Sequence, residues 1–276
     1  MENIKREISK ITDNIDNWLN KEALRKYIGL IDLTSLNSAD TSSKIFGLVE
    51  KVNNFNIDFP KYPSVAAMCV YPNFAKLLKS SLKVKNVKIA VVAGAFPSSQ
   101  SFKEIKTAEC RMAVENGADE VDIVLALNKF LDKKYEETKS EIRDIKAVIG
   151  DKHLKVILET GVLKEEHLID YAAEIAIESG ADFIKTSTGK IEPAATPEAA
   201  YIMCKRIKAY YEKTGKRIGF KPAGGISTPK EAALYFAIVE NVLGNEWLTP
   251  QLFRFGASRL ANNLLTEVEG KVINYF

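Results

Sequence analysis

Eight runs of strand-like sequence alternate with helical stretches along most of this chain. The strand-like runs are rich in apolar residues and cover residues 27–34, 64–70, 87–93, 120–125, 154–160, 182–186, 217–221 and 252–256. Between and after them, apolar residues recur at helical spacing near residues 38–53, 72–80, 102–116, 135–149, 164–179, 197–214, 229–243 and 258–265. Such alternation is typical of parallel sheets covered by helices, so it predicts an α/β fold.

Two architectures can hold this many strand–helix pairs, a (β/α)8 TIM barrel and a doubly wound open sheet. A doubly wound sheet usually carries a glycine-rich nucleotide fingerprint after an early strand, and the first predicted strand, which contains Leu30-Ile31-Asp32-Leu33, has none. A length of 276 residues suits one barrel, and no Pro/Gly/Ser-rich linker divides the chain. We therefore predict a single TIM-barrel domain over residues 1–276.

The residues before the first predicted strand form an N-terminal helical extension, residues 1–26. Its apolar side chains predict one amphipathic helix or two, because they recur at helical spacing at Ile4, Ile8, Ile11, Ile15, Trp18 and Leu19. The extension lacks the hydrophobic core of a signal peptide. No segment of the chain is apolar for long enough to cross a bilayer. We therefore expect a cytoplasmic protein without a membrane partner.

The net charge argues against nucleic-acid binding, and the few cysteines and histidines argue against a metal site. The formal net charge is only +3, and the lysines are scattered along helical faces opposite acidic residues, so we predict no nucleic-acid partner. Cys69, Cys110 and Cys204 are too far apart to suggest a disulfide framework or a metal cluster, as expected in a reducing compartment. With only His153 and His167, a histidine-based metal site is not expected. We predict no metal and no cofactor.

Lys185 ends the sixth predicted strand, Asp182-Phe183-Ile184-Lys185. An ammonium group is costly to hold in a strand interior unless a partner compensates for its lost hydration. A chain that places a lysine there usually needs its amine, and a neutral amine condenses with carbonyl compounds to a Schiff base. The alternative is that Lys185 is a solvated lysine at a strand end.

A short sequence that occurs twice in the chain relates Asp122 to Lys185. Residues 117–122 and 180–185 both begin with Gly-Ala-Asp at a predicted helix-to-strand joint. If these joints superpose, Asp122 and Lys185 occupy equivalent positions on the fourth and sixth strands. Alternate strands of a barrel supply the same layer of inward side chains. We therefore expect both side chains to reach a common substrate, although Asp122 could instead be a structural ion-pair partner.

Lys221 ends the seventh predicted strand, next to the strand that carries Lys185. Two ammonium groups a few ångströms apart repel, and the state of lower energy leaves one of them neutral. Lys221 would in this way convert Lys185 into a nucleophile at neutral pH. A phosphate-binding role for Lys221 is the alternative, and it does not exclude the first.

Two glycine-containing loops, residues 224–227 and 255–258, follow the last two predicted strands and lead into helices. Glycines let backbone N–H groups approach an anion, and helix N-termini favour negative charge. In TIM barrels these two loops are the usual phosphate site. The predicted substrate-binding residues at these loops and after the sixth strand are Thr188, Gly189, Lys190, Gly224, Gly225, Gly256 and Ser258.

Together, these motifs resemble the deoxyribose-phosphate aldolases, which are class I aldolases. The resemblance spans nearly the whole chain after about residue 28, with one motif at each strand end. Its most specific parts are Phe-Ile-Lys-Thr-Ser-Thr-Gly at residues 183–189 and Phe-Lys-Pro-Ala-Gly-Gly at residues 220–225. The other matching segments are residues 31–34, 69–72, 117–122, 154–161 and 255–258.

The resemblance implies reversible cleavage of 2-deoxy-D-ribose 5-phosphate to D-glyceraldehyde 3-phosphate and acetaldehyde, in deoxyribose phosphate catabolism. It implies that Lys185 forms the Schiff base, that Lys221 lowers its pKa, and that Asp122 transfers protons through an ordered water. We also place Asp32 and Cys69 at the substrate site; Asp32 could instead hold the lysine network, and a core role is favoured for Cys69. The expected partners are sugar phosphate and aldehyde substrates, with a homodimer as the expected assembly.

Some roles and two other functions stay open. Arg259 stands where relatives of this family carry a small residue, and its direction cannot be read from the sequence. Tyr275 is followed by Phe276, whereas many bacterial relatives end in a tyrosine that takes part in proton exchange. Glu159 either joins the network or accepts backbone hydrogen bonds. The other functions are a transaldolase-like Schiff-base enzyme and a non-catalytic sugar phosphate sensor, although binding alone does not need two close ammonium groups.

Overall fold

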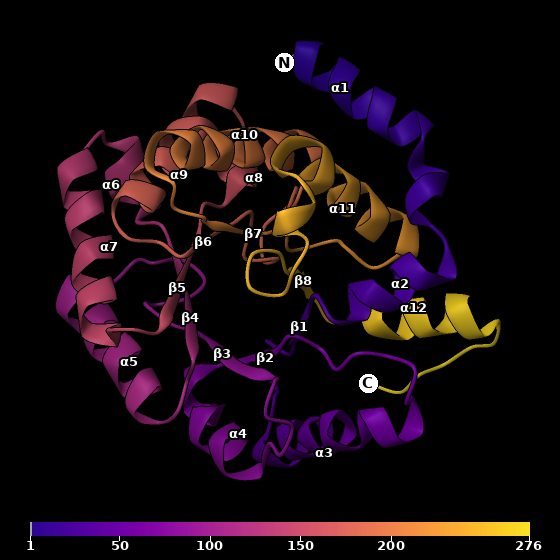
Figure 1. Cartoon of the computed structure of the whole chain (residues 1–276). Coiled ribbons are helices and arrows are strands. Elements are labelled where there is room, and N and C mark those ends of the chain that lie inside the picture. The colour runs from indigo at the N-terminus through magenta and orange to yellow at the C-terminus, as the bar shows by residue number, and fades with distance from the viewer. Residues whose placement is uncertain (1) are drawn as a thin grey trace.

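Eight parallel strands form the centre of the molecule in the computed structural model, which describes residues 2–276 (Figure 1). Met1, the first residue of the predicted N-terminal extension, lies outside the described residues. The strands are shorter than the sequence pattern suggested. They are β1 (Ile31–Thr34), β2 (Ala67–Val70), β3 (Lys88–Val92), β4 (Glu120–Val124), β5 (His153–Ile157), β6 (Phe183–Lys185), β7 (Gly219–Lys221) and β8 (Phe255–Ala257).

The sheet closes on itself. Its hydrogen-bonded order is β7-β6-β5-β4-β3-β2-β1-β8, so consecutive strands are neighbours and β1 also pairs with β8. The ends of this order meet through isolated pairs between Phe220 and Phe253 and between Ala223 and Gly256. The backbone N–H of Arg254 also donates to the Phe220 carbonyl at 3.1 Å. These contacts complete a barrel, and the predicted (β/α)8 TIM barrel is confirmed.

Helices cover the outside of the barrel (Figure 1). Two of them start as local sequence dictates: Thr196 and Thr228 cap α10 and α11 by accepting backbone hydrogen bonds, and proline follows each cap. The main helices are α3 (Ser42–Asp58), α4 (Ala75–Ser81), α5 (Lys103–Glu115), α7 (Tyr135–Ile149), α9 (Glu166–Glu178), α10 (Pro197–Thr214), α11 (Pro229–Leu243) and α12 (Leu260–Glu269). Within the described residues, none is both long and apolar enough to span a membrane.

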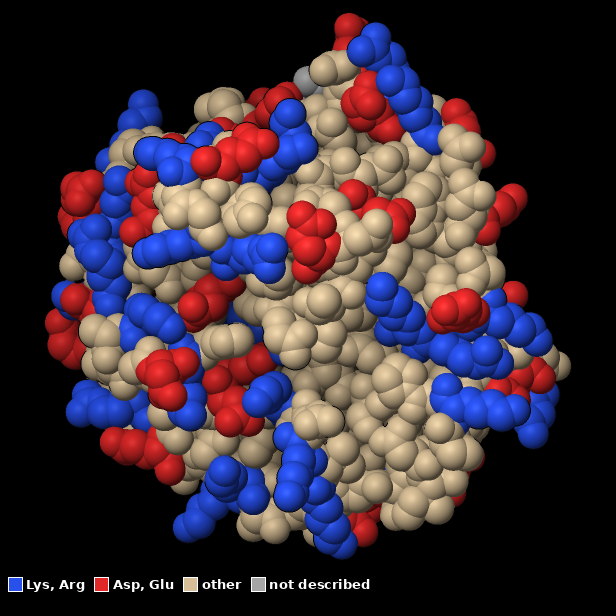
Figure 2. Space-filling model, viewed as in Figure 1, with Lys and Arg blue, Asp and Glu red and all other residues tan. Residues whose placement is uncertain are grey.

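Five short helices within residues 2–276 complete the connections. Two of them, η1 (Ile15–Trp18) and η2 (Pro72–Phe74), lie within stretches that were expected to be helical. The other three were not predicted: α6 (Leu127–Leu131), α8 (Thr160–Leu163) and η3 (Asn245–Trp247). Each spans five residues or fewer, which is too short for an apolar repeat of period 3.6 to be recognised. On the face of the molecule in Figure 2, acidic and basic residues are interspersed, and no continuous basic stripe crosses it.

The N-terminal segment forms α1 (Glu2–Asp13) and α2 (Lys21–Ile28). Helix α1 buries Ile4, Ile8 and Ile11 and packs on the outside of α10 and α11 (Figure 1). Helix α2 ends at Ile28, so the expectation that Tyr27 and Ile28 begin the first strand is wrong. Both are fully buried with α2 in helical conformation, and the apolar run continues into β1, so its local pattern did not mark the boundary. The division of the chain into one domain with an extension over residues 1–26 stays a prediction.

The interior of the barrel differs from the layer between strands and helices. That outer layer is a large apolar core. The interior holds only a small apolar cluster, Leu36, Ala67, Cys69, Ala90 and Val92. The remaining inward positions carry seven charged or basic side chains, each at most 3% exposed, which we call the buried charge cluster: Asp32, Glu120, Asp122, Lys155, Lys185, Lys221 and Arg254.

Strand register explains how this cluster is arranged. Asp122 on β4 pairs with Lys155 on β5, and Lys155 pairs with Phe183 on β6. Along the hydrogen-bonded ladder, Asp122 is therefore level with Phe183, which precedes Lys185 by two residues. Barrel strands tilt, and a shear of about eight residues over eight strands advances each inward layer by about one residue per strand. Asp122 and Lys185, two strands apart, therefore fall in one layer. This geometry agrees with the expectation, drawn from the repeated Gly-Ala-Asp sequence, that Asp122 and Lys185 point inward in the same layer of the barrel.

Candidate active site

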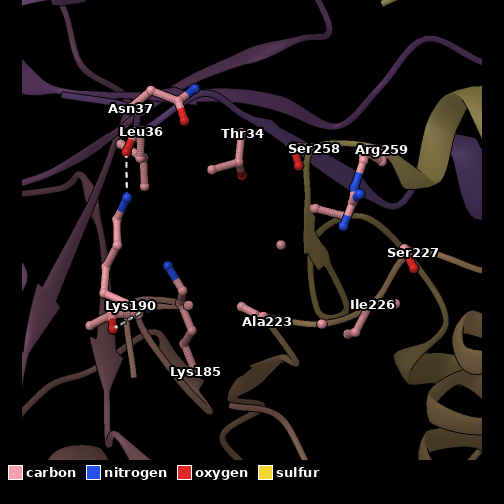
Figure 3. A pocket seen from close by; sticks show the side chains of 16 residues that line it. Thr34, Leu36, Asn37, Lys185, Lys190, Ala223, Ile226, Ser227, Ser258 and Arg259 are labelled. Atoms are coloured by element: carbon pink, nitrogen blue, oxygen red, sulfur yellow. Dashed lines mark hydrogen bonds between the residues drawn. The ribbon is translucent and has the colours of Figure 1, made fainter. Parts of the chain in front are cut away.

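A cavity of about 230 Å³ opens at the carboxyl ends of the strands (Figure 3). Its walls contain three basic side chains, from Lys185, Lys190 and Arg259, and no Asp or Glu among the described residues. The cavity therefore offers a positive surface that is able to hold an anion. The other residues lining it are Thr34, Leu36, Asn37, Thr188, Gly189, Ala223, Gly224, Gly225, Ile226, Ser227, Gly256, Ala257 and Ser258.

Lys185 connects this cavity with the buried charge cluster. It is the last residue of β6 and is 3% exposed, and its side chain points into the cavity (Figure 3). Its Nζ also donates to Asp122 Oδ2 at 3.1 Å. The amine is therefore held from one side by a carboxylate and is accessible to a small molecule from the other.

Asp122 is the centre of the cluster. Its Oδ1 accepts from Lys155 at 2.9 Å, and its Oδ2 accepts from Lys221 at 2.8 Å as well as from Lys185. Burial alone would raise the pKa of Asp122, but the three lysines outweigh burial and hold that pKa well below its usual value. Asp122 is therefore ionised at neutral pH.

Lys221 lies beside Asp122 and also forms an ion pair with Asp32, whose Oδ2 is 2.5 Å from the Lys221 Nζ. Burial opposes the charge on Lys221, yet Asp122 and Asp32 raise its pKa above the ordinary value. Lys155, below them, bonds to Glu120 at 2.5 Å and to Asp122; these carboxylates raise its pKa despite its burial. Both lysines therefore remain protonated.

Lys185 behaves differently from the other basic groups. Its pKa is lowered, first because it is buried and second because the charge of Lys221 lies close by, and a single hydrogen bond to Asp122 does not offset these effects. The pKa of Arg254 is raised by Asp32 and Glu120 against the effect of burial. Lys185 is thus the basic group of the cluster that gives up its proton first, and the remaining three cations balance three carboxylates.

The loop after β6 is held in place by Glu159, which follows β5. The Glu159 backbone is left-handed, with φ at 52°, a conformation that is strained for a residue with a side chain. Its carboxylate accepts from the Thr188 backbone N–H at 3.1 Å and from the Thr188 hydroxyl at 2.6 Å. Across the cavity, Lys190 Nζ donates to the Leu36 carbonyl at 2.6 Å, which ties the β6 loop to the β1 loop (Figure 3). The contacts of Glu159 are therefore with the loop and not with the cluster.

The glycine loop after β7 has the geometry of an anion site. Gly224 and Gly225 have φ values of 87° and 80°, which glycine adopts without strain. A Cβ on Gly224 would come 2.5 Å from the Ala194 Cβ, whereas Gly225 faces open space. Within residues 2–276, the backbone N–H groups of Gly224 and Gly225 have no hydrogen-bond acceptor, and the same holds for Ser258. These donors are therefore available to a bound anion.

One expectation about this loop is wrong: the N–H groups of Gly224 and Gly225 do not lie at a helix start. Helix α11 begins at Pro229, and its first turn is capped internally, because the Glu231 carboxylate accepts from Ser227 N and Thr228 N at 2.8 Å each. The start of α11 is therefore neutralised by its own glutamate. An anion here would depend on the loop donors and on Arg259.

Comparison with known proteins assigns the family. A model of the DeoC/LacD family of aldolases matches residues 26–244. The chain belongs to this family. A Caenorhabditis elegans protein with the provisional name deoxyribose-phosphate aldolase is 44% identical over 264 residues, which are 94% of this chain and 86% of that protein. The predicted resemblance and the predicted enzyme class, a lyase, are confirmed.

Solved structures support the same family and fold. The aldolase QR15 is 31% identical with a TM-score of 0.68, and the match covers 90% of this chain and 95% of that one. The deoxyribose phosphate aldolase of Aeropyrum pernix, described as a tetramer, is 22% identical with a TM-score of 0.69 over 95% of this chain and 97% of that one. At that identity, the second likeness supports the barrel alone.

In this aldolase, the predicted site residues fall into two groups. Eight of them line the cavity: Lys185, Thr188, Gly189, Lys190, Gly224, Gly225, Gly256 and Ser258. The other four are fully buried below it: Asp32, Cys69, Asp122 and Lys221. Asp32 lies in the lysine network rather than at the cavity wall, and Cys69 packs in the small apolar cluster. Their substrate-binding roles stay predictions.

Tyr275 lies away from the cavity of the aldolase. Its hydroxyl donates to Asp58 Oδ2 at 2.7 Å and lies 2.9 Å from the Lys51 carbonyl, both on α3. Its ring packs edge-on against Phe55 and Phe59. The described arrangement therefore ties the C-terminus to α3.

Lys155 and Arg254 belong to the cluster, although they were not singled out in the sequence. Both carry the signal that drew attention to Lys185, a charged residue between apolar neighbours in a strand-like run. Arg254 bonds to Asp32 Oδ1 at 2.5 Å and to Glu120 Oε1 at 2.9 Å. Neither residue lies at the carboxyl end of its strand, where side chains reach the mouth of the barrel.

Proposed function

We propose that this aldolase cleaves 2-deoxy-D-ribose 5-phosphate to D-glyceraldehyde 3-phosphate and acetaldehyde through a Schiff base on Lys185. The observation that carries the proposal is one buried amine with a lowered pKa that faces a positive cavity without acidic walls. The name of the Caenorhabditis elegans relative supports this substrate. Acetaldehyde released from deoxyribose 5-phosphate by the purified protein tests the proposal, and a protein that released none would contradict it.

The residue types suit each chemical step. The neutral Nζ of Lys185 attacks C1 of the open-chain aldehyde, and loss of water from the carbinolamine leaves an iminium. A base then removes the proton of the C3 hydroxyl, the bond between C2 and C3 breaks, and its electron pair moves to the iminium nitrogen. This step releases glyceraldehyde 3-phosphate and leaves an enamine. Protonation of the enamine at C2 and hydrolysis then yield acetaldehyde and free Lys185.

Proton transfer is the part that we assign to Asp122 and Lys221. Asp122 accepts hydrogen bonds from Lys185 and Lys221 on the same oxygen, so it lies beside the nitrogen that gains and loses protons. In the proposed cycle, an ordered water between Asp122 and the substrate takes the proton from the C3 hydroxyl and later delivers a proton to C2 of the enamine. Burial and, after it, the positive charge of Lys221 lower the pKa of Lys185 and so favour its neutral form.

We propose that the substrate phosphate binds at the free N–H groups of residues 224–225 and 258 and at Arg259. Arg259 is exposed, lines the cavity and forms no ion pair with a described residue. Its guanidinium matches the geometry of phosphate oxygens. A phosphate held there would leave the aldehyde end of the sugar near Lys185.

The Arg259→Gln variant should lose affinity for the phosphorylated substrate selectively. A charge-assisted hydrogen bond contributes about 1.5–3 kcal/mol, so KM for deoxyribose 5-phosphate should rise roughly 10- to 100-fold. Deoxyribose without phosphate is the matched control, because it cannot use Arg259, and its kcat/KM should stay within about twofold. Equal losses for both substrates would assign Arg259 to the shape of the cavity mouth.

Activity should not depend on a metal ion. Within the described part of the chain, no three His, Cys, Asp or Glu side chains gather in a way that could hold one. In the proposed reaction, the protonated imine accepts the electron pair that a metal would otherwise stabilise. We expect full activity after exhaustive dialysis against EDTA; activity lost on chelation and regained with zinc would place the reaction in the other class of aldolases.

We also propose the cellular setting that follows from this reaction. The protein would act in deoxyribose phosphate catabolism in the cytoplasm, without a cofactor or a nucleic-acid partner. Interspersed surface charge on the face in Figure 2 supports the last point. A homodimer is the assembly that we propose, and sedimentation velocity would test it.

A further inference from the structure

Arg254 bridges two carboxylates at the far end of the barrel interior. It immediately precedes β8, is 3% exposed, and lines with Glu120 a cavity on the side opposite the active site. Its Nη1 donates to Asp32 Oδ1 at 2.5 Å and to Glu120 Oε2 at 3.3 Å, its Nη2 donates to Glu120 Oε1 at 2.9 Å, and its Nε donates to the Pro250 carbonyl. Its guanidinium also lies 5.8 Å from the centre of the Phe183 ring. No hydrogen bond or ion pair joins Arg254 to Lys185 within the described residues.

Both carboxylates that Arg254 bridges lead to Asp122. Asp32 pairs with Lys221 at 2.5 Å, and Lys221 bonds to Asp122 at 2.8 Å. Glu120 pairs with Lys155 at 2.5 Å, and Lys155 bonds to Asp122 at 2.9 Å. Two branches of alternating charge thus run from Arg254 through the barrel interior and meet at the carboxylate that contacts Lys185.

Resting on the proposed Schiff-base function, we propose that Arg254 is a positioning residue that keeps the Lys185 amine neutral from the opposite end of the barrel. Three carboxylates in the cluster are balanced by Lys155, Lys221 and Arg254. A fourth positive charge, on Lys185, would therefore be in excess. Because little water reaches this interior, an unbalanced charge there is expensive, and the cluster excludes the surplus proton.

Loss of Arg254 reverses this balance. Three carboxylates would then face only two permanent cations, so protonation of Lys185 would restore neutrality. Since the reaction needs the neutral amine, activity is lost as pH falls through the pKa of Lys185. We call this fall on the acidic side of the pH profile the acid limb. A higher pKa of Lys185 moves the acid limb to higher pH. The ionisable groups within and directly around the cluster are Asp32, Cys69, Glu120, Asp122, His153, Lys155, Lys185, Lys221 and Arg254. From β3, the exposed Lys88 lines the same far-side cavity as Glu120 and Arg254.

The test measures how fast Lys185 is trapped as its reduced acetaldehyde adduct, with cyanoborohydride, between pH 5 and 9. The Arg254→Gln variant should move the acid limb upward by about one pH unit, and Glu120→Gln, which removes an anion, should move it downward. The double variant, which loses one charge of each sign, should return to the wild-type limb, and Arg254→Lys should stay near it. A loss of folded protein that is the same at every pH lowers the amplitude and leaves the position of the limb unchanged, so the folded fraction is measured by circular dichroism at each pH.

Three outcomes would overturn the inference. They are an unchanged acid limb with lower amplitude in Arg254→Gln, shifts of the same sign in the two single variants, and no recovery in the double variant. Each would mean that Arg254 only supports the fold, or that Asp32 or Glu120 takes up the proton. If Arg254→Gln does not fold, the downward shift of Glu120→Gln and the position of Arg254→Lys decide the matter. Failure of wild-type trapping on Lys185 would instead contradict the proposed function.

Discussion

Replacing Lys185 by methionine should reduce cleavage of deoxyribose 5-phosphate by at least about 10³-fold, because no other amine is placed to form the imine. Lys221 is buried below the cavity and carries a raised pKa, and Lys190 is bonded to the Leu36 carbonyl. The variant should nevertheless fold, since Lys185 contacts a single carboxylate within the described structure and has a lowered pKa, so its removal leaves less buried charge uncompensated than removal of Lys155, Lys221 or Arg254. Thermal unfolding followed by circular dichroism measures this second expectation.

Lys190→Met is the matched control, because it makes the same substitution in the same cavity. We expect it to weaken substrate binding but to retain a borohydride-reduced acetaldehyde adduct on Lys185, located by peptide mass spectrometry. Lys221→Met offers a contrast, since it leaves Asp32 and Asp122 with less compensation and should destabilise the protein by roughly 3–5 kcal/mol. An adduct found on Lys221 alone, or full turnover in Lys185→Met, would refute the assignment.

Replacing Asp122 by asparagine should reduce turnover by about 10²–10⁴-fold, the usual loss when a general acid–base is removed. The amide has nearly the same shape as the carboxylate but cannot cycle a proton at neutral pH. Asp122 accepts bonds from three lysines, so the variant also leaves buried positive charge uncompensated, with an expected loss of stability of roughly 3–5 kcal/mol. Turnover must therefore be measured on protein shown to be folded at the assay temperature.

Glu120→Gln is the control for this effect of charge. It removes one carboxylate of the same cluster from the same strand, but Glu120 contacts Lys155 and Arg254 and not Lys185. Above its acid limb, its turnover should stay within about tenfold of wild type. Equal losses in Asp122→Asn and Glu120→Gln would show that the cluster's charge matters and that Asp122 transfers no proton.

The barrel was predictable because its pattern is local. Strand-like runs of five to eight residues and helices with a repeat of 3.6 can be recognised within a short window, and caps such as Thr196 and Thr228 mark where helices start. The errors lie at boundaries. Tyr27 and Ile28 continue the apolar run of β1, yet they belong to α2, since a residue buried from a helix and one buried from a strand look alike in sequence.

The sequence predicted the part of the site that consists of side chains at the carboxyl ends of the strands. Lys185, Asp122 and Lys221 were expected to meet, and they lie within hydrogen-bond distance of a shared carboxylate oxygen. Lys155 and Arg254 were not expected there, because Lys155 lies in the middle of β5 and Arg254 lies at the end of the barrel opposite the mouth. The contact of Glu159 with Thr188 was also not predictable, because it joins two loops that are 29 positions apart and depends on a left-handed backbone.

The sequence by itself determined the alternation of strands and helices, and with it the edge of the barrel at which functional side chains gather. Only the tertiary structure decided which of four buried basic groups loses its proton. That choice depends on the number and distance of neighbouring charges from other strands: among the described residues, Lys155 contacts three carboxylates, Lys221 and Arg254 contact two each, and Lys185 contacts one. A pKa is a property of the whole surrounding charge distribution, and no local pattern in the chain records it.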